Sequence, residues 1–273
     1  HEMSSYQLLH CTRSPHFAVI TAFFPEHLDY HGSLESYFEA KANIVRFQKE
    51  NDIVIFNSKQ PEVSRMANVS KGKHIPFNID NCPLQSSELQ LIGEHNRSNI
   101  AAVWLLAKEL KLPETTTLEA IRTFRGLPHR LEDLGLHHGI RWINDSISTT
   151  PESTIAALAA LPDTTTLILG GQDRGYDFTG LAATIAKNPK IHNVILFPGS
   201  GKKIEEALER NKAKVVIHNV VSMQEAISAA KSSTKSGGLC LLSPASPSYG
   251  LFKNFEERGG QFQYRIKEPC NKC

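Results

Sequence analysis

The first residues that could do chemistry lie in the polar segment 25–33, PEHLDYHGS, directly after an apolar run that is typical of a strand. Loops at the carboxyl ends of parallel strands bind ligands in α/β proteins, so this position favours a functional role. His27 and His31 have the i, i+4 spacing of a zinc pair, but Gly32 and Ser33 indicate a turn and a helix N-cap instead of the helix that a zinc motif needs. Two alternatives stay open: one histidine binds a harder ion, or both only form hydrogen bonds within the loop.

Helical patterns hold the next candidates. Lys41 stands between two alanines in the pattern 33–49, where a lysine is typically solvated. Segment 93–99, GEHNRSN, precedes an alanine-rich helical pattern, and a glycine followed by polar side chains at a helix N-terminus can hold a nucleotide or a phosphate. Capping by Asn96 or Ser98 would account for the same residue types.

Two polar segments near the middle of the chain have the composition of anion sites. Segment 126–132, GLPHRLE, places Arg130 beside a histidine, and arginine can fork to phosphate oxygens or stack on an adenine ring. Segment 144–152, NDSISTTPE, follows a strand pattern and enters a helix through a proline. Capping explains one or two of its hydroxyls, but not a run of them beside an aspartate.

Two later segments have the same character. Segment 170–178, GGQDRGYDF, combines three glycines with Arg174 and favours an anion pocket over a structural turn. Segment 243–249, SPASPSY, contains Ser248, which could bind a carboxylate near a helix start. Phe252 and Phe255 follow at i, i+3 spacing, which is more typical of core than of a ligand platform. Four strand ends of one sheet are thus predicted to carry ligand-type residues around a shared crevice for an anionic small molecule.

Strands that alternate with helices must position these loops. Short apolar runs predict strands at 17–21, 53–57, 140–144, 166–169, 194–197, 215–218 and 239–242, and helical periodicity predicts helices at 33–49, 98–110, 152–161, 202–211 and 222–231. This alternation indicates an α/β fold with parallel sheets covered on both faces. The end of a helical pattern at Gly126, with a proline two residues later, predicts one domain at 1–126 and a doubly wound domain at 127–273.

Composition limits the class of protein. The 273 residues contain 30 Lys plus Arg against 28 Asp plus Glu, a net charge of +2, and scattered basic residues argue against nucleic acid as the main partner. Every apolar run is far shorter than the ~18 residues that span a bilayer, so no transmembrane helix, signal peptide or membrane partner is expected. Five widely spaced cysteines indicate a reducing cytoplasm, and Cys270 and Cys273 are interpreted as part of a tail instead of a zinc or redox site.

Taken together, the segments resemble the Mur ligases. Eight blocks in the family's order run over nearly the whole chain: EMSSYQL at 2–8, EHLD at 26–29, AK at 40–41, GEHN with Asn99 at 93–99, GLPHRLE at 126–132, NDS at 144–146, GG with DRGYDF at 170–178, and LSPA at 242–245 with FKNFE and RG at 252–259. The resemblance implies that 1–126 is the latter part of the family's central ATP-binding domain. It also implies that 127–273 is the C-terminal, Rossmann-like domain, which binds the amino acid and closes over ATP.

The resemblance implies a function as well. The matching branch of the family is an ATP-dependent acid–amino-acid ligase that joins D-glutamate to UDP-N-acetylmuramoyl-L-alanine through an acyl phosphate, with Mg²⁺, in cytoplasmic peptidoglycan biosynthesis. Both chemical steps concentrate negative charge, which explains the need for Mg²⁺ and cationic side chains. We expect a monomer with these two substrates as its partners.

Site residues carry over by position. The implied metal ligands are Glu2, His27 and Lys41, the last as a carbamate, because carbamylation turns an ammonium into an oxygen anion that suits a hard ion. Lys41 and His27 are also the implied catalytic residues, which reverses the interpretation of Lys41 as a solvated lysine. The implied nucleotide contacts are Asn96, Asn99, Arg130 and Asp145, with Arg130 arriving when the C-terminal domain closes. The implied D-glutamate pocket consists of Thr149, Arg174, Ser248 and Phe255, with Arg174 paired to a carboxylate.

The chain also departs from the family pattern. Ile147 stands where many of these ligases have lysine, Arg174 replaces a usual lysine, Glu26 a usual aspartate and Ala22 a frequent asparagine. Arg174 keeps its charge but Ile147 removes a cation, so a Mur-type ligase for another amino acid is one alternative. The family's phosphate loop and its N-terminal domain have no counterpart in the sequence. The sequence therefore predicts a fragment of a ligase that is inactive alone. The second alternative is a non-catalytic module that binds an amino acid or a nucleotide.

Overall fold

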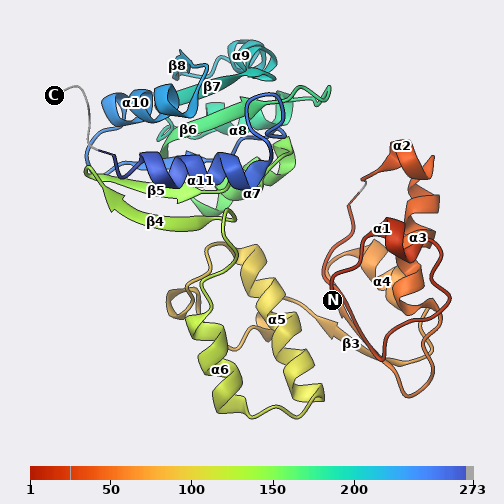
Figure 1. Cartoon of the computed structure of the whole chain (residues 1–273). Coiled ribbons are helices and arrows are strands. Elements are labelled where there is room, and N and C mark those ends of the chain that lie inside the picture. Colours follow the sequence, from red (N-terminus) through yellow and green to blue (C-terminus); the bar gives the residue numbers. More distant parts are fainter. Residues whose placement is uncertain (25, 269–273) are drawn as a thin grey trace. The chain divides into compact units, whose positions relative to one another are not determined.

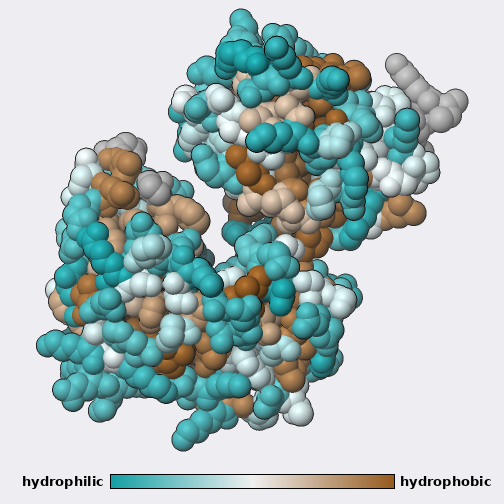
Figure 2. Space-filling view, turned by 180° about the vertical axis from the view of Figure 1, so that it is seen from behind, coloured by the Kyte–Doolittle hydropathy of each residue, from teal (hydrophilic) through white to brown (hydrophobic). Residues whose placement is uncertain are grey.

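The structure is a computed structural model that describes residues 1–24 and 26–268. Two units divide the chain (Figure 1): the first comprises His1–Gln90 and Glu94–Phe124, and the second comprises Leu91–Gly93 and the chain from Arg125 onward. Hydrophilic residues cover most of the face seen in Figure 2. The interpretation of Cys270 and Cys273 as a tail concerns residues outside the described part of the chain.

The first unit is built on a parallel sheet in the order β1-β2-β3, with β1 at Phe17–Ile20, β2 at Ile53–Asn57 and β3 at Lys73–Phe77. Its helices are α1 (Ser5–Leu8), α2 (Leu28–His31), α3 (Leu34–Arg46), α4 (Pro61–Ala67), η1 (Ile79–Asn81), η2 (Ser86–Glu88), α5 (Glu94–Glu109) and α6 (Glu114–Thr123). Neighbouring strand residues face opposite sides of the sheet. Val54 and Phe56 therefore join a core with α3 and α4, while Ile55 packs against the alanines of α5.

The second unit contains a sheet in the order β4-β5-β9-β6-β7-β8, in which only β4 is antiparallel to its neighbour among the described residues. Its strands are β4 (Glu132–His137), β5 (Ile140–Asn144), β6 (Thr164–Gly171), β7 (Asn193–Gly199), β8 (Val216–Asn219) and β9 (Leu239–Leu242). Its helices are α7 (Pro151–Ala160), α8 (Thr179–Lys187), α9 (Gly201–Arg210), α10 (Met223–Ser233) and α11 (Phe255–Arg265).

Helices cover both faces of the second sheet. One core joins α7, α8 and α9 to strand residues such as Leu167 and Leu169. The other joins α10 and α11 to Ile168 and Trp142, and it includes Phe252, as the spacing of that residue predicted. Strands buried on both faces explain why the sequence shows continuous apolar runs here instead of alternation. The predicted α/β fold with parallel, doubly covered sheets is confirmed.

Strands β3 and β4 and helices such as α4 and α8 were not among the predicted elements, and α5 starts earlier than predicted. β3 contains Pro76 and was not predicted, but it is an edge strand, where a missing amide is tolerated. β4 was not predicted because its sequence, EDLGLH, is polar and contains a glycine. α5 begins at Glu94, so the segment expected to precede a helix is the first part of that helix, and Ser98 is not its cap.

The predicted set of four strand ends on one sheet needs a correction. The segment that contains His27 follows β1, which belongs to the sheet of the first unit. Segments 144–152, 170–178 and 243–249 follow β5, β6 and β9 in the second unit. The shared crevice can therefore involve three of the four strand ends.

Candidate functional site

In the second unit, the carboxyl ends of β5, β9 and β6 lie side by side, because β9 pairs with both other strands. The chain leaves β5 toward α7 on one face of the sheet and leaves β9 toward α11 on the other face (Figure 1). Neighbouring strands whose connections leave to opposite faces open a crevice at their carboxyl ends, where α/β proteins bind ligands. Segments 144–150, 170–178 and 243–248 form this edge, which we call the ligand edge.

Asp145 lies buried on the ligand edge at the end of β5. Its Oδ2 accepts a hydrogen bond from the Ser243 hydroxyl at 2.8 Å, and its Oδ1 accepts one from the Leu131 amide at 3.1 Å. Burial raises the pKa of Asp145 above its usual range, while hydrogen bonds from Ser148 and Ser243 and the charge of Arg130 act in the opposite direction. The exposed Arg130 guanidinium and the buried Asp145 carboxylate, both predicted nucleotide contacts, thus interact electrostatically.

Three predicted D-glutamate residues lie where helices begin at this edge. Thr149 is half-buried just before Thr150, the N-cap of α7, whose hydroxyl accepts a hydrogen bond from the Ser153 amide. Ser248 is buried on the segment after β9. Phe255 begins α11, and its carbonyl accepts a hydrogen bond from the Ser146 hydroxyl at 2.8 Å. The first turns of α7 and α11 are therefore tied to the segment after β5, and helix N-termini favour anions.

The segment after β6 is held against the segment after β9 by a glycine. Gly171 has a φ of +151°, and a Cβ at this position would lie 2.2 Å from the Pro247 carbonyl oxygen. The Gln172 amide donates to the same carbonyl at 2.8 Å. Arg174 is exposed beyond this contact and donates to the Gln172 side chain at 3.4 Å. Within the described residues no hydrogen bond joins the Arg174 guanidinium to the other predicted pocket residues.

His129 connects the segment that contains Arg130 to α11. It has a φ of +64°, and its Nδ1 lies 2.9 Å from the Asn144 Nδ2. Its ring packs against Phe255 with centroids 6.1 Å apart. A Cβ on Gly259 would lie 2.2 Å from His129 Nδ1, so the absence of a side chain at Gly259 makes room for the imidazole. The sequence offered no role for His129 beyond its position beside Arg130.

In the first unit, Tyr37 of α3 is the centre of a group of aromatic and charged side chains. The Lys41 amine lies 5.5 Å from its ring centroid, and the rings of His27 and His31 lie 6.4 and 5.3 Å away. Burial, with smaller effects from the charges of Glu26 and Tyr6, raises the pKa of Tyr37 to about 12. The phenol is therefore neutral at physiological pH, and the structure brings two of the three predicted metal ligands, His27 and Lys41, to the same tyrosine.

The two histidines of this group differ. His31 Nε2 lies 3.0 Å from the hydroxyl of Ser5 in α1, so this histidine forms a hydrogen bond within the unit but outside the segment 25–33. His27 has a φ of +55°, and its Nε2 lies 3.8 Å from a Glu26 carboxylate oxygen. Glu2 is exposed on the segment before α1.

The side chains of this group do not form a metal site by themselves. In the described part of the chain, no three His, Cys, Asp or Glu side chains gather closely enough to hold a metal ion. An unmodified Lys41 is a cation and repels a metal. A carbamate on Lys41 would add the oxygen ligands that the group lacks, and Mg²⁺ commonly takes its remaining ligands from water and phosphates.

The predicted nucleotide contacts of the first unit lie on α5. Asn96 is half-buried and Asn99 is exposed, and both fall within the first two turns of the helix. Asn96 was not expected inside a helix, whereas Asn99 lies within the helix predicted at 98–110. Residues three apart on a helix share one face, so both amides are presented on the same side of α5.

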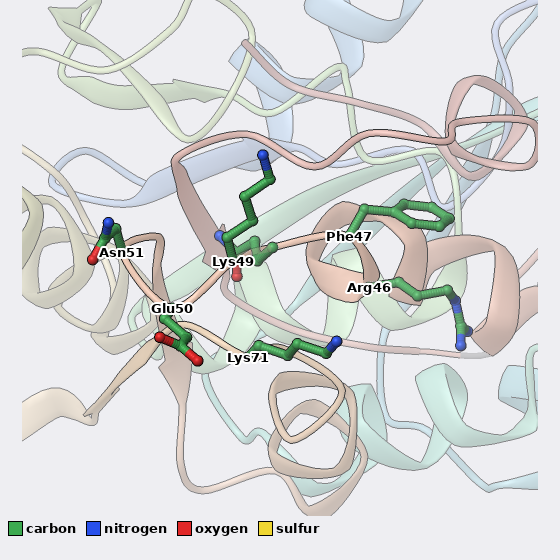
Figure 3. Close-up of a pocket in the computed structure, with 7 residues that line it drawn as sticks. Arg46, Phe47, Lys49, Glu50, Asn51 and Lys71 are labelled. Carbon is green, nitrogen blue, oxygen red and sulfur yellow. The ribbon is translucent and has the colours of Figure 1, made fainter.

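A cavity of about 520 Å³ in the first unit contains none of the predicted site residues. It is lined by Arg46, Phe47, Gln48, Lys49, Glu50, Asn51 and Lys71, at the amino ends of β2 and β3 (Figure 3). The side chains of Lys49 and Lys71 point in different directions there, so their amines do not converge on one ligand. The cavity therefore lies at the amino end of β2, whereas the predicted sites follow the carboxyl ends of strands.

Sequence reasoning gave no role to Arg258, a buried residue of the ligand edge. Arg258 belonged to the last block of the resemblance, but charged residues are usually placed on the surface. A signal was present, because Phe255, Phe262 and Ile266 follow helical spacing and place Arg258 on the apolar stripe of α11. Tyr37 was also missed, since an isolated tyrosine in a helical pattern carries no such signal.

Two α/β units, one of which has a ligand edge where neighbouring strands connect to opposite faces of the sheet, define the class of multidomain α/β proteins with a crevice at the carboxyl ends of parallel strands. Family models narrow the class: residues 1–84 match the Mur ligase middle domain, and residues 129–246 match the Mur ligase glutamate ligase domain. The chain belongs to the Mur ligase family.

Curated relatives agree with this assignment. The chain is 34% identical over 97% of its length to a UDP-N-acetylmuramoylalanine–D-glutamate ligase of Symbiobacterium thermophilum, and 34% identical over 96% to one of Streptococcus agalactiae. It is also 33% identical over 98% of its length to a UDP-N-acetylmuramoyl-L-alanine–L-glutamate ligase of Salinispora tropica. The chain spans 61–64% of the length of these relatives.

Solved structures share the fold. MurF from Acinetobacter baumannii matches with a TM-score of 0.68 at 16% identity, covering 93% of this chain and 60% of that one. MurF ligase from Thermotoga maritima, solved in complex with ADP, matches with a TM-score of 0.65 at 15% identity, covering 93% of this chain and 63% of that one. No helix among the described residues is both long and apolar enough to cross a membrane.

Proposed function

We propose that this chain works as part of an ATP-dependent ligase that adds D-glutamate to UDP-N-acetylmuramoyl-L-alanine in peptidoglycan biosynthesis. The observation that carries the proposal is the 34% identity to D-glutamate ligases over 97% of the chain. The ligand edge supports it, because it combines a buried carboxylate, two helix N-termini and exposed arginines. We also propose the division into a central ATP-binding domain at 1–126 and an amino-acid-binding domain at 127–273, in a monomeric cytoplasmic enzyme.

The second unit is proposed to bind the amino acid. A carboxylate of D-glutamate would pair with Arg174, which is exposed and engages only a neutral side-chain amide in the described structure. The proposed pocket is completed by the N-terminal turns of α7 and α11, with Thr149, Ser248 and Phe255. These groups would hold the amine in place for attack on the activated carboxyl carbon, and orientation of this kind is a main source of rate enhancement.

Nucleotide binding is proposed for Arg130 and Asp145 from the second unit and for Asn96 and Asn99 from the first. The exposed Arg130 can reach phosphate oxygens, whereas the hydrogen bonds of Asp145 to Ser243 and Leu131 fix the carboxylate in one orientation. The ADP complex of the MurF ligase from Thermotoga maritima supports nucleotide binding by this fold. The first step would activate the alanine carboxylate as an acyl phosphate, and the amine of D-glutamate would then displace phosphate.

The first unit is proposed to carry the metal ligands Glu2, His27 and carbamylated Lys41, with Lys41 and His27 as its catalytic residues. Mg²⁺ bound with the nucleotide phosphates would supply charge stabilisation. Tyr37 supports the role of Lys41, because its ring, whose phenol is neutral at physiological pH, lies 5.5 Å from the lysine amine and holds that side chain beside His27.

L-Glutamate is a second candidate for the amino acid. The relative from Salinispora tropica is named as an L-glutamate ligase, and it is 33% identical to this chain. Ile147 also removes a cation from the segment after β5, directly beside the proposed pocket. Loss of this cation alters how the second carboxylate or the amine of the amino acid is bound. Specificity is the difference between the affinities for D-glutamate and for L-glutamate, so this change affects it.

Phosphate release by the full-length protein that contains this chain tests the proposal. We expect release only when UDP-N-acetylmuramoyl-L-alanine, Mg²⁺-ATP and D-glutamate are all present. Release with L-glutamate alone would establish the second candidate. A protein that binds these ligands without releasing phosphate under any combination would be a binding module, and the ligase proposal would be wrong.

A further inference from the structure

Arg258, in the second turn of α11, is completely buried, with 0% of its surface exposed. Within the described residues it forms no ion pair with a carboxylate. Burial alone lowers its pKa, to about 9, so the guanidinium is still charged at neutral pH. A buried charge without a counter-ion is unfavourable for folding, which makes this residue unusual in a core.

Within the described residues, all the side-chain hydrogen bonds of Arg258 go to the ligand edge. Its Nε donates to the Ser146 hydroxyl at 3.0 Å and one terminal nitrogen donates to the Ser146 carbonyl at 2.7 Å. The other terminal nitrogen donates to the Ser246 carbonyl at 3.0 Å. The planar guanidinium therefore fixes the segment after β5 and the segment after β9 at the same time, from a third element.

The network continues beyond these contacts. The Ser146 hydroxyl donates to the Phe255 carbonyl at 2.8 Å, and the Ser246 hydroxyl lies 2.7 Å from the hydroxyl of Ser200, at the start of α9. Each of these serines is buried. A buried polar network in which each guanidinium nitrogen has a hydrogen-bond partner favours one arrangement of the backbone, which hydrophobic contacts alone would leave less defined.

We propose that Arg258 is the positioning residue of the ligand edge: it holds the segments 145–148 and 246–248 in the geometry that binds an amino-acid carboxylate, and its unpaired charge favours that anion. The inference rests on the proposed function for the identity of the ligand. The buried guanidinium also supplies a positive charge behind the segment that contains Ile147.

Two substitutions separate positioning from simple stability. Arg258→Met keeps the volume of the side chain but removes the charge and all three hydrogen bonds, whereas Arg258→Lys keeps the charge without the planar fork. Arg265→Met is the matched control, because Arg265 lies on the same helix but donates to Gln224 and Glu268, away from the ligand edge. All variants are made in the 273-residue chain, and binding of D-glutamate is followed by NMR titration.

We expect Arg258→Met to raise the Kd for D-glutamate at least tenfold, Arg258→Lys to raise it less, and Arg265→Met to leave it within twofold. Amide hydrogen exchange of 145–148 and 246–248 should accelerate at least tenfold in Arg258→Lys, with no change in β6. Equal acceleration of amide exchange in these two segments and in β6 would overturn the proposal. An unchanged Kd for D-glutamate in a folded Arg258→Met variant would also overturn it. If Arg258→Met does not fold, Arg258→Lys decides by its exchange pattern. If the parent chain binds no D-glutamate, the proposed ligand fails, and the exchange arm still decides the positioning role.

Discussion

Two adjacent glycines of α11 provide a sharp test of how the ligand edge is packed. A Cβ on Gly259 would lie 2.2 Å from His129 Nδ1, whereas a Cβ on Gly260 would meet no atom within 4 Å. Both positions are helical, so alanine gains about 1 kcal/mol of helix propensity at either one. The two variants therefore share the same backbone effect and differ only in the contact with His129.

The expected magnitudes follow from this difference. Gly260→Ala should stabilise the second unit by about 1 kcal/mol, which raises its Tm by roughly 2–4 °C. In Gly259→Ala the imidazole must move, at a cost of about 1–3 kcal/mol for overpacking and about 1 kcal/mol for the lost hydrogen bond to Asn144. After the gain in propensity, a net loss of about 2 kcal/mol remains, or a Tm lower by roughly 4–8 °C.

Tryptophan fluorescence can follow the second unit alone. The chain has two tryptophans, Trp104 in α5 of the first unit and Trp142 in β5 of the second. Trp142 packs against Phe262 of α11 with ring centroids 5.7 Å apart, so it reports directly on this helix. In a Trp104→Phe background, urea unfolding of both alanine variants is compared with the parent. Equal stability of the two variants would refute the described packing of His129.

Three further predictions concern the ligand edge and Lys41. Burial raises the pKa of Asp145 above 3.8, so the folded state binds a proton more readily than the unfolded state, and the resulting stability is lost as pH rises from 3.8 through the raised pKa. The stability of the parent relative to Asp145→Asn should therefore increase as urea unfolding is moved from pH 7 toward pH 3.8, and a constant difference would contradict this. Gly171→Ala should destabilise the second unit by about 3 kcal/mol or more, because its Cβ meets the Pro247 carbonyl. Gly180→Ala in α8, where the nearest contact of the Cβ is at 3.8 Å, should not destabilise it, and similar unfolding midpoints for the two variants would exclude the close approach of Gly171 to Pro247. Lys41→Ala in the full-length protein should lower turnover by about 10–100-fold without rescue by bicarbonate, and unchanged phosphate release would remove the carbamate role.

Much of the fold followed from local patterns. The strands at 53–57, 140–144 and 239–242 were predicted with the bounds that the structure has, because buried parallel strands give continuous apolar runs. β4 and β3 could not be predicted in this way, since the first is polar and partly exposed and the second contains Pro76 on a sheet edge. Such strands are stabilised by pairing with a neighbour that lies far away in the sequence or is itself unidentified.

The candidate site was only partly predictable. The positions of the segments at strand ends followed from the order of elements, which placed Asp145 directly after β5, where the structure has it. Its hydrogen bond to Ser243 joins residues 98 positions apart, and the bonds of Arg258 to Ser146 join residues 112 apart. Local spacing contains no information about such pairs. Arg258 in particular contradicts the general rule that charged residues lie outside, and that rule fails most often at functional sites.

The central claim is that this chain belongs to a working ligase for D-glutamate, and phosphate release measures it most directly. The full-length protein should release one phosphate for each D-glutamate joined to UDP-N-acetylmuramoyl-L-alanine, and it should release none when either substrate is omitted. Replacement of D-glutamate by L-glutamate in the same assay should abolish the release of phosphate. Release that is independent of the amino acid, or that requires L-glutamate, would contradict the account.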